Sequence, residues 1–445
     1  MSDALERIER TLEEDAPALF RLLSPLGHRA VFPPGIPFQA AEARGKRFNG
    51  TIGQITDGRG GAVPLPSLAA GLAGLAADGP LGAAAGNRAL LYSPVEGIPE
   101  LRALWRKRQR RDAPAGAPST LPLVTDGLSH ALSICADLFA GEGRTVVVPD
   151  PFWGNYRGCF AGRTGARLAA APTYRGRRFD PGALAAAADA LPGGEPALAV
   201  VNFPSNPGGY SPSVEERALL ADSLAAAAGR RPLLVVCDDA YAGLVFDDAV
   251  PRGSMFWQLA GRHPNLVPVK IDGATKELAF FGGRVGFLTF AFDPDSAVAA
   301  ALESKVKFLV RATVGSPVAA TQVLVAQALG SPTLDAEFEA VRGLLAGRVE
   351  MLRAALAACD PALLRPLPFN SGCFALVELT PREQGGAGLE PETLRRHLLD
   401  HHEVGLVSIQ PRYLRLAHCS VDATDLPELV ARMEQGAREL AARPA

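Results

Sequence analysis

The chain has 445 residues, of which 48% are hydrophobic, and a formal charge of −2. This length allows two domains with a sizeable core, and the near-neutral charge gives no reason to expect nucleic acid or an anionic membrane as a partner. The acidic, helix-patterned start and the lack of a long apolar run predict neither a signal or transit peptide nor a membrane span, so we expect a cytoplasmic protein.

The first fifty or so residues are rich in Pro and Gly, and we expect an arm that packs on a neighbouring chain or on a small domain. Further along, several short runs are Val/Leu-rich, do not alternate, and end at a polar residue or Pro. That pattern is typical of strands buried on both faces of a parallel sheet. These runs are Thr145–Val148, Leu198–Val201, Leu233–Cys237 and Leu266–Ile271. Ala-rich helical stretches such as 183–190 and 224–228 lie between them, which predicts a doubly wound α/β domain.

From about Ala312 onward the pattern changes to long helical segments with shorter strand-like pieces between them. The predicted helices are Ala336–Cys359, Glu392–His402 and Asp425–Ala442, and the strands are Cys373–Leu379 and Tyr413–Ala417. We therefore expect a second, smaller α+β domain. The division that we predict assigns 1–65 to the N-terminal arm and part of the small domain, 66–335 to the large ligand-binding domain, and 336–445 to the C-terminal small domain.

Neither the six cysteines nor the seven histidines form a metal-binding motif. The scattered cysteines are expected to be free, buried thiols, which fits a reducing cytoplasm. The adjacent pair His401–His402 is interpreted as the solvated end of a helix, and no metal site is predicted.

Three polar residues follow the predicted buried strands, where an open α/β sheet binds its ligand. Asp238 ends one strand, and a buried carboxylate is costly unless it is paired, although a helix cap or turn would also explain it. Lys276 follows another strand, and Arg284 stands eight residues later in an apolar, Gly-rich stretch. Two cations in such a stretch indicate an anion between them, and one ligand carrying both a phosphate and an aldehyde would satisfy both.

A series of motifs runs in order from about Asn49 to Ser420. It includes NGTIGQITDG, LYSPVEGIPELR, TDGLSHAL, PDPFWGNY, FPSNPGGYSP, DDAY, the stretch from Lys276 to Arg284, and YLRLAHCS. In these motifs the chain resembles the fold-type-I pyridoxal-phosphate aminotransferases, most closely the aspartate/aromatic group. The resemblance implies a large domain with a mostly parallel sheet, a small α+β domain, pyridoxal 5′-phosphate as cofactor and a homodimer as the active unit.

The resemblance also assigns cofactor contacts. Lys276 corresponds to the lysine that binds the cofactor aldehyde and then moves the substrate proton. Asp238 would keep the ring nitrogen protonated, and Tyr241 would donate to the ring oxygen, completing the catalytic set. The remaining implied cofactor-binding residues are Tyr92 from the neighbouring subunit, Gly127, Leu128, Ser129, Trp153, Asn206, Thr275 and Arg284.

Four residues are implied to bind the substrate, an amino acid or a 2-oxo acid: Gly53, Asn206, Arg311 and Arg415. Arg415 would hold the α-carboxylate through two hydrogen bonds. Arg311 would reach a side-chain carboxylate across the dimer, although a surface position on a helix or a place beside the phosphate would explain it equally well.

The chain departs from the family pattern at two positions near the cofactor. Gly273 stands where a serine often helps to hold the phosphate, and the nearby Thr275 is the expected substitute. Tyr156 stands where the aspartate enzymes carry a histidine that supports the buried aspartate.

Two other functions stay open at this point. A lyase or decarboxylase on the same scaffold would share the cofactor motifs, and product analysis would distinguish it from a transaminase. A non-catalytic sensor of the kind found in transcription regulators would need a basic DNA-binding domain, whereas only about fifty acidic-to-neutral residues precede the first motif.

Overall fold

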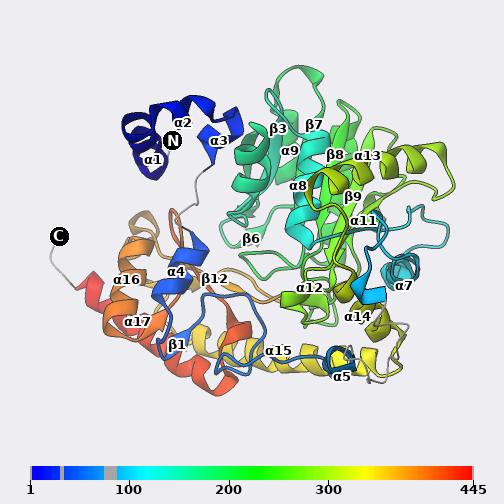
Figure 1. Cartoon of the computed structure of the whole chain (residues 1–445). Coiled ribbons are helices and arrows are strands. Elements are labelled where there is room, and N and C mark those ends of the chain that lie inside the picture. The colour runs from blue at the N-terminus through cyan, green and yellow to red at the C-terminus, as the bar shows by residue number, and fades with distance from the viewer. Residues whose placement is uncertain (1–2, 31–34, 75–87, 443–445) are drawn as a thin grey trace.

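The computed structural model describes residues 3–30, 35–74 and 88–442, which form two main sheets and two short strand pairs with helices around them (Figure 1). The larger sheet has seven strands, which are, in spatial order, β2 (Leu123–Thr125), β10 (Gly286–Phe290), β9 (Leu266–Gly273), β8 (Leu233–Asp238), β7 (Ala197–Asn202), β3 (Thr145–Asp150) and β4 (Arg167–Pro172). The five strands from β9 to β4 are parallel, and β10 runs antiparallel to both of its neighbours. The α/β fold with a mostly parallel sheet is therefore confirmed.

Helices cover both faces of this sheet, because successive residues of its central strands are buried on opposite sides. On one face, Val146, Val148 and Val236 share a core with α8 (Leu128–Phe139). On the other, Val147 and Val235 pack with α9 (Ala183–Asp189) and α10 (Val214–Ala228). Burial on both faces explains why these strands show no alternation of polar and apolar residues.

The smaller sheet is antiparallel and has its own hydrophobic core. Its order is β11 (Leu364–Pro366), β12 (Ala375–Leu379), β15 (Tyr413–Leu416) and β14 (Val407–Ile409), and it packs with α16 (Pro391–His401) and α17 (Leu426–Ala441). The long helix α15 (Leu334–Ala357) joins both cores, since Val341 and Leu345 belong to the first and Leu352 and Leu356 to the second.

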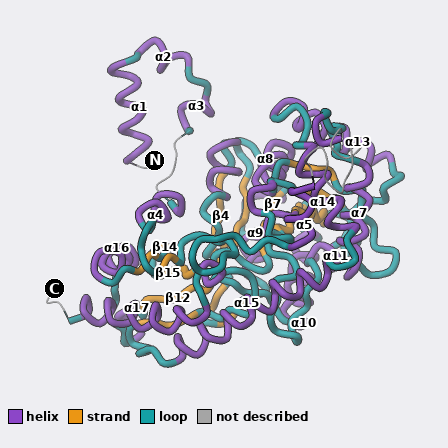
Figure 2. Tube along the Cα trace, turned by 60° about the horizontal axis from the view of Figure 1, so that its bottom comes forward, coloured by secondary structure: helices purple, strands orange, loops and turns teal. Residues whose placement is uncertain are grey.

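Residues 36–49 pack on the smaller sheet. Helix α4 (Ile36–Glu42) carries Gln39, which exchanges two hydrogen bonds with Ser408, and β1 (Phe48–Asn49) pairs with β13 (Val404–Gly405). Helices α1 (Asp3–Asp15), α2 (Pro17–Leu22) and α3 (Pro25–Arg29) stand beside the body as a separate group, which Figure 2 shows clearly. Arg29 ties this group to the body by donating to the Gly162 carbonyl at 3.2 Å.

The sequence-based expectations differ from the structure at particular places. Strands β2, β4 and β10 were not foreseen, since β2 has three residues, β4 is partly exposed, and β10 follows a Gly-rich loop. The interpretation of His402 as solvated is wrong, because His402 is 7% exposed and lies against α17, whereas His401 is exposed. All six cysteines are free and buried, as expected.

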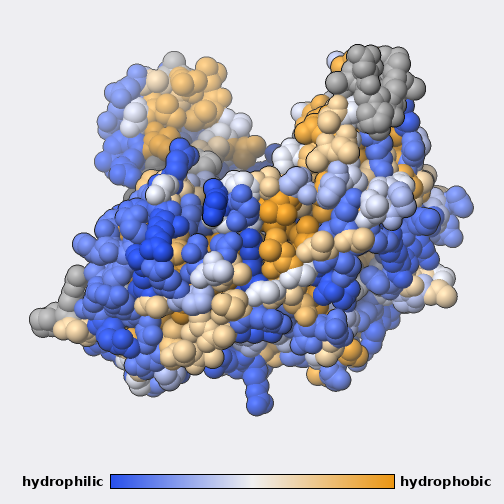
Figure 3. Space-filling model, turned by 90° about the horizontal axis from the view of Figure 1, so that it is seen from below, coloured by the Kyte–Doolittle hydropathy of each residue, from blue (hydrophilic) through white to orange (hydrophobic). Residues whose placement is uncertain are grey.

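The outer surface is mainly hydrophilic on the face shown in Figure 3, with hydrophobic residues gathered in a strip near its middle. Within the described ranges, no helix combines the length and the apolar character that crossing a bilayer requires.

Candidate active site

A cavity of about 240 Å³ lies at the carboxyl ends of β7 and β8, beside the N-terminus of α8. Its lining brings together residues from nine separate stretches of the chain. They are Ile36, Ile52, Gly53, Leu128, Ser129, Leu132, Trp153, Asn202, Asn206, Asp238, Ala240, Tyr241, Lys276, Arg284, Phe374 and Arg415. Ten of the residues singled out from the sequence therefore face one cavity, in the position where an open α/β sheet binds its ligand.

Asp238 ends β8 and is buried in the floor of this cavity. The Tyr156 hydroxyl donates to its Oδ2 at 2.5 Å, and the Ala240 amide donates to its Oδ1 at 3.2 Å. Burial raises the pKa of the Asp238 carboxyl, while the Tyr156 hydroxyl and the charge of Lys276 partly offset that rise. Tyr156 thus supports the carboxylate from the side away from the cavity.

Lys276 lies on the short helix α12 (Ala274–Glu277), immediately after β9. Its Nζ is 5.4 Å from the centroid of the Tyr241 ring. Burial lowers the pKa of the Lys276 amine, Asp238 opposes the change, and the positive charge of Arg284 adds to it. A lower pKa leaves more of the amine uncharged and nucleophilic at neutral pH.

One end of the cavity is built to receive an anion. Gly127 precedes α8 with φ of +84°, and a Cβ there would lie 2.5 Å from an Nη of Arg284, so only glycine lets the guanidinium approach. The first amides of α8, those of Leu128 and Ser129, are free of intrahelical partners. The Thr275 Oγ1 is buried without a hydrogen-bond partner among the residues that the structure describes.

The departure at Gly273 has a steric cause. A Cβ at this position would lie 2.5 Å from the Val285 carbonyl oxygen and 2.9 Å from the Cα of Gly286. The chain therefore leaves no room for a serine here, and Thr275 offers the nearby hydroxyl instead.

The opposite end of the cavity carries Arg415, on β15 of the smaller sheet. Its guanidinium donates to Asn206 Oδ1 at 3.2 Å and to the Thr51 carbonyl at 2.6 Å, and it lies 4.4 Å above the Phe374 ring. Burial lowers the pKa of Arg415 to about 10, and its Nε has no partner among the described residues. A Cβ at Gly53 would meet the same Phe374 ring at 2.4 Å, so glycine keeps the chain close to the cavity.

Four residues implicated by the sequence do not line the cavity. Gly127 and Thr275 lie beside the end of the cavity that is suited to an anion, as described above. Tyr92 and Arg311 lie outside it, and both are exposed, Tyr92 to 95%.

Three contributors were missed or given no role from the sequence. Tyr156 was noticed only as a departure from the family pattern, although a buried tyrosine close to Trp153 in sequence could have suggested a partner for Asp238. Asn202 ends β7 and donates to the Asp238 carbonyl at 2.8 Å. Its position at the end of a predicted strand could have indicated that it lies at the ligand-binding edge of the sheet. Nothing in the sequence singled out Phe374, whose ring packs edge-on against Tyr241.

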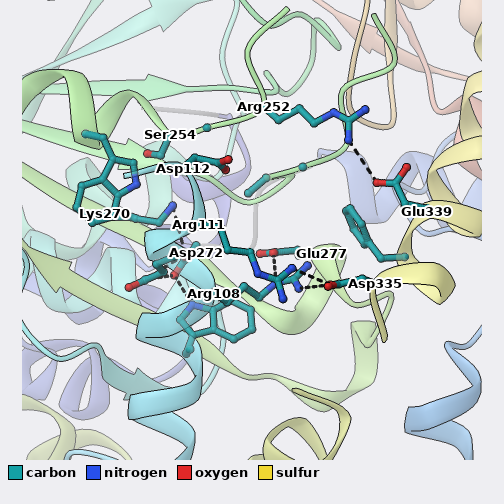
Figure 4. Close-up of a pocket in the computed structure, with 17 residues that line it drawn as sticks. Arg108, Arg111, Asp112, Arg252, Ser254, Lys270, Asp272, Glu277, Asp335 and Glu339 are labelled. Atoms are coloured by element: carbon teal, nitrogen blue, oxygen red, sulfur yellow. Dashed lines mark hydrogen bonds and ion pairs between the residues drawn. The ribbon is translucent and has the colours of Figure 1, made fainter. Parts of the chain in front are cut away.

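A second polar cavity, of about 230 Å³, has a lining that shares no residue with the first (Figure 4). Buried Lys270 pairs there with Asp239 and Asp272, and Arg108 Nε lies 2.5 Å from Glu277 Oε1. Nearer the surface, Arg111 pairs with Asp335 and Arg252 with Glu339. Because its charges are already paired with one another, this cavity is a weaker candidate for ligand binding.

The ion pairs of the second cavity anchor the residues that follow Asp238 and Lys276 in the sequence. Asp239 follows Asp238 and Glu277 follows Lys276, so both side chains are flanked by anchored backbone. Removing one partner of such a buried pair leaves an uncompensated charge, which is strongly destabilising.

The fold and the cavity together define a member of a known enzyme family. The chain belongs to the family "Aminotransferase class I and II", whose sequence model matches residues 52–433. It is 31% identical over 205 residues to the aspartate/prephenate aminotransferase of Cereibacter sphaeroides, covering 44% of this chain and 47% of that protein. It is 29% identical over 270 residues to a probable N-succinyldiaminopimelate aminotransferase of Mycobacterium tuberculosis, covering 60% and 62%.

The matched stretches span about half the length of several curated relatives.

Among solved structures, an aminotransferase from Anaerococcus prevotii superposes with a TM-score of 0.79 at 18% identity, covering 93% of this chain and 98% of that one. A kynurenine aminotransferase from Pyrococcus horikoshii gives 0.78 at 16% identity, covering 96% and 99%. These likenesses show the fold.

Proposed function

We propose that this protein is a pyridoxal-phosphate-dependent aminotransferase, which moves an amino group between an L-amino acid and a 2-oxo acid. The observation that carries the proposal is the convergence of Lys276 and Asp238 on one cavity, between an anion-binding end and a buried arginine. Family membership and the names of the curated relatives support it.

The residues around the cavity fit the cofactor. The unpartnered Thr275 hydroxyl, the open amides of α8 and Arg284 suit its phosphate, and Trp153 offers an aromatic face for its ring. When bound, pyridoxal phosphate supplies an aldehyde for an amine and a protonated ring that withdraws electrons from the substrate's α-carbon.

The chain's own groups then have distinct tasks. Asp238, which accepts hydrogen bonds from Tyr156 and Ala240, would hold a proton on the ring nitrogen, while Tyr241 and Asn206 would donate to the ring oxygen. The Lys276 amine would hold the aldehyde until a substrate amine takes its place, and would then accept and return the proton of the substrate's α-carbon. Its lowered pKa suits it to both tasks.

The substrate's α-carboxylate belongs at Arg415, which has a free Nε beside Asn206 and the glycine backbone at Gly53. We propose aspartate, glutamate or an aromatic amino acid as the substrate class. The acidic choice rests on Arg311, which is exposed on α13 (Ala297–Thr313) and would enter the site of a second subunit.

A homodimer fits the exposed apolar residues near Tyr92 and Arg311. Leu90 is 87% and Tyr92 95% exposed, and Ser93 bonds to the Pro317 carbonyl, which brings this segment beside the end of α13. Phe308 lies one helical turn from Arg311 and is 71% exposed. Such large exposed apolar side chains mark a surface that another chain covers.

Two further proposals concern location and organisation. Six free, buried thiols support a reducing, cytoplasmic setting. The separate cores of the two sheets support the division of the chain at residues 65 and 335, with α15 shared between them.

The test is spectroscopic. Purified protein should be yellow, lose that colour with its amino acid, and regain it with a 2-oxo acid, without net release of ammonia or carbon dioxide. A lyase or decarboxylase would release those products without an amino acceptor.

The Lys276→Ala variant should bind the cofactor without a covalent link and lose turnover by several orders of magnitude, because its amine is both anchor and proton carrier. The control is Lys107→Ala, which removes an exposed lysine on α7 (Pro99–Gln109). Normal transamination by Lys276→Ala would refute the proposed mechanism.

A further inference from the structure

The two helices that pack on the smaller sheet, α16 and α17, bring three ligand-type side chains together, and none of the three lines the cavity described above. His397 lies in the second half of α16, His402 follows that helix, and Glu439 lies in the last turn of α17. Helices α16 and α17 run side by side (Figure 1). His397 Nε2 is 2.8 Å and His402 Nε2 2.9 Å from the same oxygen of Glu439, Oε2.

We propose that His397, His402 and Glu439 form a binding site for a divalent transition metal, zinc above all, which fastens the end of α16 to α17. Two imidazoles and one carboxylate are ligands that zinc favours, and three protein ligands leave a fourth position for water.

The geometry needs little adjustment to take the metal. The three ligand atoms lie within 4.8 Å of one another. In a tetrahedral site with metal–ligand bonds of about 2.0–2.1 Å, ligand atoms are separated by roughly 3.3–3.4 Å. Each imidazole nitrogen, at 2.8 or 2.9 Å from Glu439 Oε2, would have to lie about half an ångström further from that oxygen, and the exposed Glu439 side chain can move by this amount. The two rings would also turn until their nitrogens lie at the same spacing.

The surroundings hold the ligands in place. Gln435 donates to the other carboxylate oxygen of Glu439 at 3.0 Å, which is the kind of outer contact that orients a metal ligand. Arg432 donates to the His402 carbonyl at 2.9 Å. A Cβ at Gly436 would lie 3.4 Å from His402 Nε2, so glycine lets α17 approach the ring.

The charges near the site also favour a cation. Glu439 brings a carboxylate to the site, and both imidazoles contact the same oxygen of it. The two neighbouring arginines on α17 are engaged elsewhere, Arg432 by Glu428 and Arg438 by Glu434. The exposed His401 adds a third imidazole, with its ring centroid 4.7 Å from that of His397.

Without metal, the same atoms form two ordinary hydrogen bonds between the imidazole rings and one carboxylate. The two possibilities differ in what they predict. A metal site binds one zinc per chain with an affinity that depends on all three residues, whereas a hydrogen-bonded triad binds none.

The experiment uses the full-length protein without an affinity tag, treated with a chelator and freed of amino acids. Zinc chloride is titrated by calorimetry, and cobalt(II) is added separately, because a tetrahedral site gives it visible absorption bands. We expect one zinc per chain, a cobalt spectrum, and a higher melting temperature in zinc.

His402→Gln and Glu439→Gln should each weaken zinc binding at least tenfold and abolish the rise in melting temperature. Glu439→Gln changes an exposed side chain by one atom, so it keeps the test valid if a histidine variant does not fold. His28→Gln is the matched control, because His28 forms a similar pair with Glu9 but has no second histidine beside it. Absence of zinc binding, or equal binding by Glu439→Gln and His28→Gln, would overturn the proposal.

Discussion

Tyr156 takes over a supporting role that the resemblance assigns to a histidine. Its hydroxyl donates to Asp238, and this contact keeps the pKa of the carboxyl lower than burial alone would leave it. In Tyr156→Phe the hydroxyl is lost, so the pKa of Asp238 rises further. Because the ionised carboxylate is the active form, activity should then disappear at a higher pH as the solution is acidified.

The measurement for Tyr156→Phe is the pH dependence of kcat/KM, with kcat at neutral pH expected to fall about 10- to 100-fold, the worth of a hydrogen bond to a charged group. Tyr174→Phe provides a control, since Tyr174 is a half-buried tyrosine that does not contact Asp238. An unchanged acid limb would mean that Tyr156 only fills space.

Arg415 is expected to bind the α-carboxylate through a planar fork, so lysine should not replace it. Arg415→Lys keeps the charge but loses paired donors, and KM for the amino acid should rise about 10- to 100-fold. Steady-state kinetics would measure this, with Arg412→Lys, a half-exposed arginine paired with Glu378, as control. A KM that rises equally in both variants would argue against a specific carboxylate contact.

At the scale of elements, the buried parallel strands were predictable because burial on both faces forces continuous apolar runs. Their real bounds extend one or two residues further, to Asp150, Asn202, Asp238 and Gly273, since hydrogen bonding in the sheet continues into polar residues. Strand β10 could not be predicted in the same way. Its antiparallel place in the sheet depends on pairing with β2, which lies more than a hundred residues earlier in the chain.

The turn between β9 and α12 offers a prediction at this scale. Gly273→Ser would press its Cβ against the Val285 carbonyl and the backbone of Gly286, and β9 and β10 pair at this point. Overpacking of this kind should cost about 1–3 kcal/mol of unfolding free energy. Urea denaturation would measure the loss, and Gly282→Ser, at a position with no atom within 4 Å of the added Cβ, should cost much less. Equal stability of the two variants would contradict the steric account.

At the scale of the whole molecule, the site draws on segments from Gly53 to Arg415, and the residue pattern alone could not bring these together. The sequence motifs supplied their identity, and strand ends supplied a common edge for Asp238 and Lys276. What stayed hidden were contacts between distant segments. Phe374 is one case, and the His402–Glu439 pair is another, since nothing local in either segment indicates its partner.

Tyr92 and Arg311 lie outside the cavity of their own chain, and their exposure leads to a prediction about the dimer. If they enter the neighbour's site, two defective chains can complement each other. One chain carries Lys276→Ala, and the other carries Tyr92→Phe with Arg311→Ala. In a mixed dimer, one site collects every defect, while the other combines an intact Lys276 with an intact Tyr92 and Arg311.

Co-expression at equal levels gives mixed dimers as half of the population, each with one working site, so about a quarter of the wild-type activity on an acidic amino acid should return. The measurement compares this mixture with each variant alone, and with separately purified variants assayed immediately after mixing, before subunits exchange. If Tyr92 and Arg311 served only their own chain, each chain would keep its own defect in every dimer. The activity of the co-expressed protein would then not exceed the average of the activities of the two variants expressed alone.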